Sequence, residues 1–529
     1  MTTAKLSIRH QFTGGWATDF GVNSDNTPNP NGIVQLPFLL NAEDCVYELD
    51  GGPRMVGGAT KLNSSALESG AVIKGIFDYW DIGTAGAPSQ HRVIYVGTTI
   101  KNDDADGSFS NLFTGLQPGG VPSFCILEDL LVISLDTSDT PKSWDGSTAQ
   151  ALAGSPPNFA FCIEHKNKLW AAGVDANSSR LYYSVSLNGA DWSSSGSGSI
   201  DISPRDGDRI TGLISFKNEL WVFKGPYKGS IHRITGSAPT GDDAFARKTF
   251  TQGVGSVGHN TIFIARDDVG FMWSDGTIHS LKATEAFGDF SESTLTRPIN
   301  INFIDKRFNF NRLKHAMAAN DSANGKVWFA VPIDSSQNNN VMLCMDYRFE
   351  PVRWSLIVTI SGGAIALVVD PGAANRHIIM IGGNDGFVRK FGQARHSIDG
   401  ATKYNYKVTT PFLTYGVPVI QKTITEAAIG IFPKNDGNIT LIWRRDDEAE
   451  QSVAITQGGG DVLGTASANQ FTLGTSKLSG DQFLDRFNDT LTGAFRAIQY
   501  EWTSATLNED IEVHSLSAAI EGGNWSTEL

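Results

Sequence analysis

Short apolar runs recur along most of the chain, each followed by a polar turn. The clearest are NKLWAAGV (167–174), NELWVFKG (218–225), DVGFMWSDG (268–276) and GKVWFAVP (325–332). Each run places an aromatic residue beside aliphatic ones and is bounded by turn-forming residues. Runs of this length and composition are typical of β-strands rather than helices. The pattern therefore predicts a chain built mainly from short strands.

The four runs also repeat at a nearly constant interval. Their tryptophans, Trp170, Trp221, Trp273 and Trp328, are spaced by 51, 52 and 55 residues. Similar strand–turn–strand segments occur at 91–100, 127–146 and 377–392, which makes about seven units between residues 65 and 395. A period of roughly 40–50 residues with several strands per unit indicates a β-propeller, in which neighbouring blades cover each other's faces. Six or eight blades also fit, and any β-rich chain carries some aromatic strands at irregular spacing.

The two ends of the chain have a different character. From about residue 400, segments such as KTITEAAIGIFP and FRAIQYEWTS alternate apolar and polar residues, which predicts a β-sandwich with solvated outer faces. The Gly/Ser-rich stretch 456–482 reads as a contact loop, a lid or a flexible linker. Near the start, the Pro- and Asn-rich segment before residue 37 predicts an exposed arm or long loop. A strand pair across Gly51-Gly52 follows it.

The predicted fold is thus all-β, an irregular β-propeller of about six to eight blades with an N-terminal arm and a C-terminal β-sandwich-like domain. The expected divisions are 1–62 for the arm and first strands, 63–398 for the propeller and 399–529 for the sandwich-like domain.

Composition supports a soluble, folded protein. The chain carries 56 glycines, 12 tryptophans and 30 phenylalanines, which suits many tight turns and aromatic strands. The formal net charge is −14. A sequence-specific nucleic-acid binder would show a basic patch, and none is evident in the sequence. Acidity fits a conduit through which DNA slides without sticking, and it equally fits a protein that merely needs to stay soluble.

The four cysteines, Cys45, Cys125, Cys162 and Cys344, lack metal-ligand spacing. Three of them lie in apolar runs, so buried free thiols are expected rather than disulfides. The first residues lack the apolar core of a secretory signal, and no apolar stretch reaches the roughly 18 residues that cross a bilayer. We therefore expect folding in a reducing cytosol and no membrane segment.

One stretch resembles the start of a calcium-binding loop. Asn102, Asp104, Asp106 and Gly107 occupy positions one, three, five and six, but Phe113 stands where a bidentate glutamate is needed. An acidic hairpin tip is the simpler interpretation, with weak adventitious Ca²⁺ binding as the alternative. The histidines form no metal pair, and His91, His165 and His232, which flank blade strands, are expected to be hydrogen-bonded structural residues.

The sequence predicts no catalytic, cofactor-binding or metal-binding residues. SVSLNGADWS (184–193) comes close to the Asp-box turn of sialidase-type propellers, through Ser186, Asn188, Gly189, Asp191 and Trp192, and WSDGTIHSL (273–281) is a weaker match. Such boxes are structural turns. A glycosidase also needs a pair of carboxylates over the propeller axis, and no pair stands out among the 56 acidic residues.

The order of parts resembles the nozzle proteins (tail tubular or packaged-DNA-stabilising proteins) of short-tailed bacteriophages. The resemblance rests on LPFLLNAEDCVYELDGGPRMVGG (36–58) with its Pro53-Arg54 pair, and on the segment from Gly493 to Tyr500, which fits the family pattern G-x-(F/R)-R-x-I-Q-hydrophobic. It implies a non-enzymatic, hexameric ring at the distal end of the tail tube, in a virion assembled in the host cytoplasm.

The same resemblance implies the partners and the mechanical role. The ring would contact a tail adaptor ring and tail fibre or needle proteins, and its lumen would retain the genomic DNA and conduct it during ejection without sequence-specific binding. The alternatives are another virion tail protein, such as a hub, fibre adaptor or receptor-binding propeller, and a propeller glycosidase.

Overall fold

The computed structural model describes residues 5–522 apart from 13–14, 19–22, 25–32, 37, 50, 83–85, 87, 105, 283–293, 371, 373–375, 395, 416–417, 434–436, 447, 458–482, 488–492, 505 and 508–509. Residues 458–482 of the predicted Gly/Ser-rich loop (456–482) and most of the Pro- and Asn-rich segment before residue 37 fall outside these residues, whereas 456 and 457 end strand β40. Helical structure is limited to short segments, of which η3 (His259–Thr261) and η6 (Phe310–His315) matter below.

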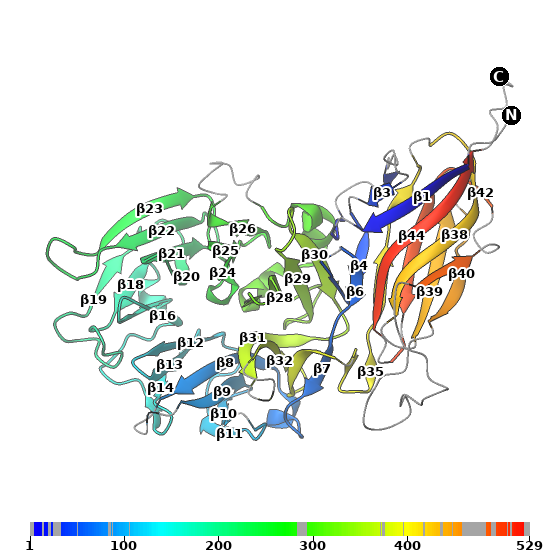
Figure 1. Ribbon diagram of the computed structural model, residues 1–529. Helices are drawn as coiled ribbons and strands as arrows, with labels where there is room; N and C mark the ends of the chain where they lie inside the picture. Colours follow the sequence, from blue (N-terminus) through cyan, green and yellow to red (C-terminus); the bar gives the residue numbers. More distant parts are fainter. Residues whose placement is uncertain are drawn as a thin grey trace.

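Seven antiparallel groups of strands follow one another around a common centre (Figure 1); five are separate small sheets and the last two are parts of larger sheets. We number these blades 1 to 7 in chain order. Blades 1 to 4 have four strands each. Blade 1 contains β8 (Ile73–Asp81), β9 (Ser89–Val96), β10 (Thr99–Asp103) and β11 (Ser110–Phe113), and blade 2 contains β12 (Pro122–Leu127), β13 (Leu130–Leu135), β14 (Lys142–Trp144) and β15 (Ala149–Ala151). Blade 3 contains β16 (Phe161–His165), β17 (Lys168–Ala172), β18 (Arg180–Tyr183) and β19 (Gly198–Asp201), and blade 4 contains β20 (Arg209–Phe216), β21 (Glu219–Gly225), β22 (Ser230–Thr235) and β23 (Ala246–Gln252).

Blades 5 to 7 are less regular. Blade 5 contains β24 (Phe263–Ala265), β25 (Asp268–Met272) and β26 (Ile278–Ser280), and blade 6 contains β27 (Met317–Asp321), β28 (Lys326–Val331), β29 (Val341–Asp346) and β30 (Arg353–Ile357). Blade 7 contains β31 (Gly362–Asp370), β32 (Arg376–Gly383) and β33 (Val388–Gln393). The innermost strands β8, β12, β16, β20, β27 and β31 run around the axis, with η3 between β20 and β27. The predicted all-β propeller is confirmed, with seven blades.

The apolar cores lie between blades, which is why each blade needs its neighbours. Trp170 packs with Leu220 and Val222 of the next blade, and Trp221 packs with Val269 and Phe271 of the blade after that. The four repeat tryptophans are all buried, and each lies on or directly after the second strand of its blade. The repeat read from the sequence therefore reflects a repeated structural position.

The last blade takes its outer strand from the N-terminal part of the chain. β7 (Gly58–Lys61) pairs antiparallel with β33, so that residues close to the start close the ring. These residues lie before the predicted propeller boundary at residue 63. Figure 1 shows β7 beside the yellow strands of this blade. A ring closed by strands from both parts of the chain is held by backbone hydrogen bonds rather than by side-chain packing alone.

Beside blades 6 and 7 lies a β-sandwich, as predicted (Figure 1). One layer contains β3 (Ile33–Leu36), β1 (Lys5–Phe12), β44 (Ile511–Gly522), β38 (Lys422–Pro433) and β41 (Phe483–Phe487), joined by β5 (Cys45–Tyr47), β6 (Pro53–Met55) and β42 (Ala494–Phe495). The other contains β2 (Asn23–Ser24), β37 (Phe412–Leu413), β43 (Ile498–Ser504), β36 (Tyr406–Thr409), β4 (Asn41–Glu43), β39 (Gly437–Arg445) and β40 (Gln451–Gln457).

Both ends of the chain build this sandwich. β1 pairs antiparallel with β44 from Lys5↔Glu521 to Gln11↔Ser515. The residues predicted as an N-terminal arm and first strands thus include strands of the sandwich and one strand of the propeller. The four cysteines are free and buried, as expected from their apolar surroundings.

Candidate functional site

A cavity of about 400 Å³, open to solvent, lies at the axis of the propeller. Inner strands of blades 1, 2, 3, 4, 6 and 7 line it, together with η3, which fills the place of an inner strand between β20 and β27. The lining is mainly apolar and includes Phe77, Phe124, Ile163, Leu213, Ile262, Met317, Ala318, Ala366 and Leu367. No charged side chain lines the cavity among the described residues. A concave cavity of this size, lined by apolar side chains with a few polar groups, is a typical place for a small ligand.

A second cavity of about 510 Å³ adjoins the first and carries charge. It lies over blades 2 to 4 and includes two ion pairs at its edge. Lys314 Nζ lies 2.9 Å from Asp136 Oδ2, and Arg209 Nη2 lies 3.1 Å from Asp175 Oδ1. These pairs are substantially exposed, so each contributes little to stability. We call this second cavity the mouth and the first the axial cavity.

Three polar residues line both cavities and mark their boundary: Ser123, His259 and Asn260. His259 stacks on Phe161 with ring centroids 5.0 Å apart, and its Nδ1 accepts a hydrogen bond from the Leu213 backbone N–H at 3.3 Å. Burial lowers the pKa of His259 to about 4, so the ring is neutral near pH 7 and Nε2 carries its proton. His259 therefore presents a hydrogen-bond donor where the cavities meet.

Asn260 is also held in a fixed orientation there. Its Nδ2 donates to the Pro122 carbonyl at 2.9 Å, which ties η3 to the first residue of β12. Sequence reasoning did not find Ser123, His259 or Asn260. No local motif marks them, because the ring brings blades 2 and 5 together only in three dimensions.

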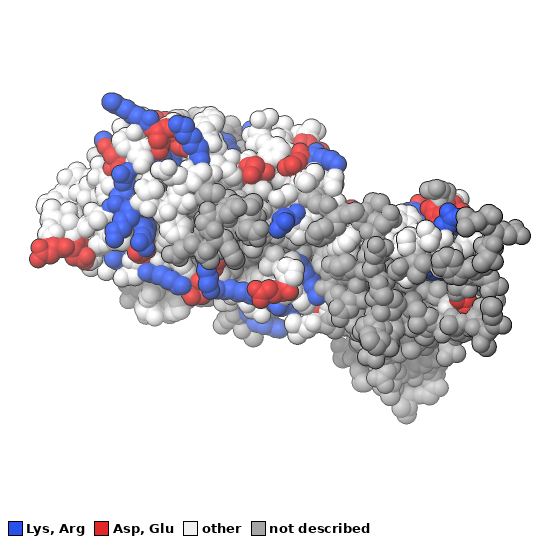
Figure 2. All heavy atoms as spheres, turned by 90° about the horizontal axis from the view of Figure 1, so that it is seen from above, with Lys and Arg blue, Asp and Glu red and all other residues white. Residues whose placement is uncertain are grey.

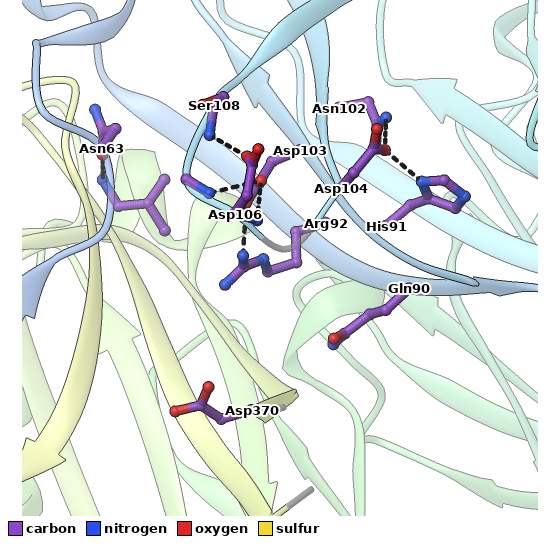
Figure 3. A network of polar contacts seen from close by, with 12 residues as sticks. Asn63, Gln90, His91, Arg92, Asn102, Asp103, Asp104, Asp106, Ser108 and Asp370 are labelled. Carbon is purple, nitrogen blue, oxygen red and sulfur yellow. Dashed lines mark hydrogen bonds and ion pairs between the residues drawn. The ribbon is translucent and has the colours of Figure 1, made fainter. Parts of the chain in front are cut away.

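The acidic stretch at 102–107 folds into a tight turn organised by Asp103 (Figure 3). Asp103 Oδ1 accepts the backbone N–H groups of Asp106 and Gly107, both at 2.8 Å, and Oδ2 pairs with Arg92 Nη2 at 2.8 Å. Both charged side chains are almost completely buried. Gly107 has φ of +91°, and a Cβ there would lie 2.6 Å from the Leu62 carbonyl oxygen, so this position requires glycine.

The expected calcium-ligand positions play other roles in this turn. Asp104 Oδ1 interacts with His91 Nδ1 at 2.8 Å and accepts a hydrogen bond from Asn102 Nδ2 at 2.8 Å. Asp106 is exposed and accepts the Ser108 N–H. The buried carboxylate belongs to Asp103, which lies outside the loop pattern and already faces a cation. Within the described part of the chain, no group of three or more His, Cys, Asp or Glu side chains is placed to hold a metal ion.

The histidines that flank blade strands are hydrogen-bonded, as expected. His165 Nδ1 lies 2.8 Å from Ser215 Oγ in the next blade, and His232 Nε2 lies 3.0 Å from Ser230 Oγ. Burial lowers the pKa of both rings to about 4. Both rings are therefore neutral near pH 7. His165 forms a hydrogen bond between two blades, and His232 forms one within its own blade.

The segments similar to Asp boxes form turns. Asp191 accepts the N–H groups of Ser193 and Ser194, and Asp275 accepts that of Thr277. These carboxylates therefore accept hydrogen bonds from neighbouring backbone N–H groups and stabilise the turns. Neither lines the mouth or the axial cavity.

No family model matches the chain, and no curated protein matches it either. Among solved structures, it is similar to the exo-β-1,3-galactanase of Phanerochaete chrysosporium, with 7% identity, a TM-score of 0.28 and coverage of 88% of this chain and 100% of that chain. It is also similar to a gluconolactonase of Xanthomonas campestris, with 13% identity, a TM-score of 0.28 and coverage of 65% and 90%. Among the described residues, no helix has the length and apolar character needed to span a membrane.

Proposed function

We propose that this chain is a structural subunit of a bacteriophage tail, forming the nozzle ring that retains the genome and conducts it during ejection. The observation that carries the proposal is a continuous sheet that joins the propeller to the sandwich. Blade 6 continues from β30 through β4 to β36 and β43 of the sandwich, so backbone hydrogen bonds run across the junction. A subunit that must bear the load of a passing genome benefits from such a joint.

Asp44 fastens this junction. Its buried carboxylate accepts the backbone N–H of Val358 at 2.9 Å, that of Thr359 at 3.2 Å and that of Asn405 at 2.9 Å, and its backbone N–H donates to the Leu356 carbonyl. One side chain from the N-terminal part thus holds the end of the propeller blade and the start of the sandwich strand. Burial, partly opposed by these hydrogen bonds, raises the pKa of Asp44.

The apolar core is continuous across the same junction. Trp354 and Phe329 of blade 6 belong to one buried cluster with Trp502 and Leu441 of the sandwich. Tyr47 also donates from its hydroxyl to the Trp354 carbonyl at 3.0 Å. Close-packed interiors transmit strain rather than absorb it. The continuous core therefore couples the propeller to the sandwich, which suits a ring component and is unnecessary for a freely rotating binding module.

Two further points agree with this role. The order of parts resembles that of the nozzle family, and the Pro53-Arg54 pair lies in β6 while Gln499 and Tyr500 lie in β43, both in the sandwich. The net charge of −14 suits a lumen that does not retain DNA. The face of the propeller rim shown in Figure 2 carries both Lys/Arg and Asp/Glu side chains. An acidic surface that faces DNA would therefore lie on another part of the subunit.

Light scattering after size exclusion, followed by negative-stain microscopy, tests the proposal. We expect a sixfold ring with a central pore, either alone or after mixing with the tail adaptor ring of the same virion. A monomer that hydrolyses glycans, or a trimer that binds cell-surface glycans without turnover, would replace the nozzle by the enzyme or the receptor-binding alternative.

A further inference from the structure

An amine without a counter-ion lies beside the axial cavity. Lys74, in β8, is half-buried, and its ammonium group has no hydrogen bond or ion pair among the residues that the structure describes. It lines a small cleft with Val121, His315 and Asn339. Burial lowers the pKa of Lys74, and the nearby charges of Arg312 and Lys314 lower it further. The one carboxylate in this group, Asp136, is already paired with Lys314.

The cleft adjoins both larger cavities. Val121 lines the cleft and the mouth, and Met317 lines the cleft and the axial cavity. Positive charge therefore gathers at the entrance to an apolar interior, with the His259 donor at the boundary. Such a site matches an elongated molecule that is anionic at one end and apolar along its length.

We propose that the propeller axis binds a single-chain amphiphile with a carboxylate head. The carboxylate lies where the cleft meets the mouth, between Lys74 of the cleft and Lys314 of the mouth, with His259 Nε2–H as a donor, and the alkyl chain enters the axial cavity. This site is separate from the nozzle role and does not depend on it. Its ligand would be a fatty acid.

Isothermal titration with sodium salts of octanoate, decanoate and dodecanoate, each below its micelle concentration, tests the proposal. Affinity should rise about fourfold for each added methylene, because each one leaves water for the apolar cavity, until the cavity is full. Lys74→Met should weaken decanoate about tenfold by removing a charged partner, and it should leave decanol binding nearly unchanged. The exposed Lys228 of blade 4 provides the control, since Lys228→Met removes an equal charge from a residue that lines none of the three cavities.

A second pair of variants tests the chain-binding part. Ala366→Phe and Ala318→Phe each place a ring in the axial cavity from a different inner strand, and both should abolish the dependence on chain length. Thermal unfolding of every variant shows that it is folded. Equal weakening by Lys74→Met and Lys228→Met, or acetate competing as well as decanoate, would overturn the proposal. Vesicles of phosphatidylglycerol that bind while free decanoate does not would also overturn it, in favour of a membrane surface.

Discussion

Arg54 and Asp510 form a bidentate ion pair although 456 residues separate them in the chain. Arg54 Nε donates to Asp510 Oδ1 at 2.9 Å, and Nη2 donates to Oδ2 at 2.6 Å. Arg54 lies in β6, whereas Asp510 directly precedes β44, so the pair fastens an N-terminal strand to the last strand. His396 Nε2 lies 3.3 Å from the same carboxylate and brings the end of the propeller into this contact.

Replacing Asp510 with asparagine should lower the free energy of unfolding by about 1.5–3 kcal/mol, because a largely buried, charge-assisted pair of hydrogen bonds is lost. Urea denaturation measures the effect. Asp201→Asn is the matched control: Asp201 forms a similar bidentate pair with Arg180, but that pair is exposed and should be worth about 0–1 kcal/mol. Equal losses in the two variants would mean that burial of the Arg54 pair adds nothing.

The contribution of Asp510 should also depend on pH. Burial alone would raise the pKa of this carboxyl, but hydrogen bonds from His396 and Arg54 outweigh burial and hold the pKa well below its usual value. A carboxyl with a depressed pKa in the folded state stabilises the protein above its unfolded pKa of about 3.9, and this stability is lost as the pH falls towards the folded pKa. The difference in unfolding free energy between wild type and Asp510→Asn should therefore be constant above about pH 5 and shrink below it. A difference that instead grew on acidification would contradict this assignment.

Arg92 and Asp103 offer a test of a fully buried pair. Arg92→Met should destabilise the protein by about 3–5 kcal/mol, because it leaves the Asp103 carboxylate buried without its cation. Arg92 Nε and Nη1 have no hydrogen-bond partner in the described part of the chain, so the pair itself is imperfectly satisfied. The double variant Arg92→Met/Asp103→Asn should thus recover part of the loss, as measured by thermal and urea denaturation. Additive losses would show that the two side chains are not energetically coupled.

The buried repeat tryptophans predict large packing effects. Trp221→Ala should cost about 3–5 kcal/mol, since Trp221 is only 8% exposed and its ring packs edge-on against Phe250. Tyr227→Ala, in the same blade, removes an aromatic ring that is 81% exposed and should be nearly neutral. Chemical denaturation of both variants is the measurement, and a neutral Trp221→Ala would mean that blades 4 and 5 do not depend on this ring.

The repeated blades were predictable because their signal is local. A strand with buried faces needs apolar and aromatic residues. Blades 3 to 6 each carry one such tryptophan at the second strand: Trp170, Trp221, Trp273 and Trp328. The closing strand β7 and the pairing of β1 with β44 were not predictable. The alternation of apolar and polar residues predicts a strand, but it does not specify which other strand pairs with it. The candidate site was missed for the same reason. His259, Lys74 and Ser123 come from blades 5, 1 and 2, and each residue alone looks ordinary.

The acidic stretch shows a related limit. The spacing of Asn102, Asp104 and Asp106 resembles that of a calcium-binding loop, yet Asp103 is the residue that organises the turn. Its importance follows from the burial of Arg92, which lies in the neighbouring strand, eleven residues away in sequence. Spacing alone does not reveal which carboxylate faces inward.

The pairing of β1 with β44 has a consequence for synthesis on the ribosome. At about 5–20 residues per second, β44 leaves the ribosome roughly 25–100 s after β1. Throughout that interval β1 lacks its antiparallel partner, and β7 waits about two thirds as long for β33. Vectorial folding can therefore complete the middle blades early, whereas closure of the ring waits for β33 and completion of the sandwich waits for β44.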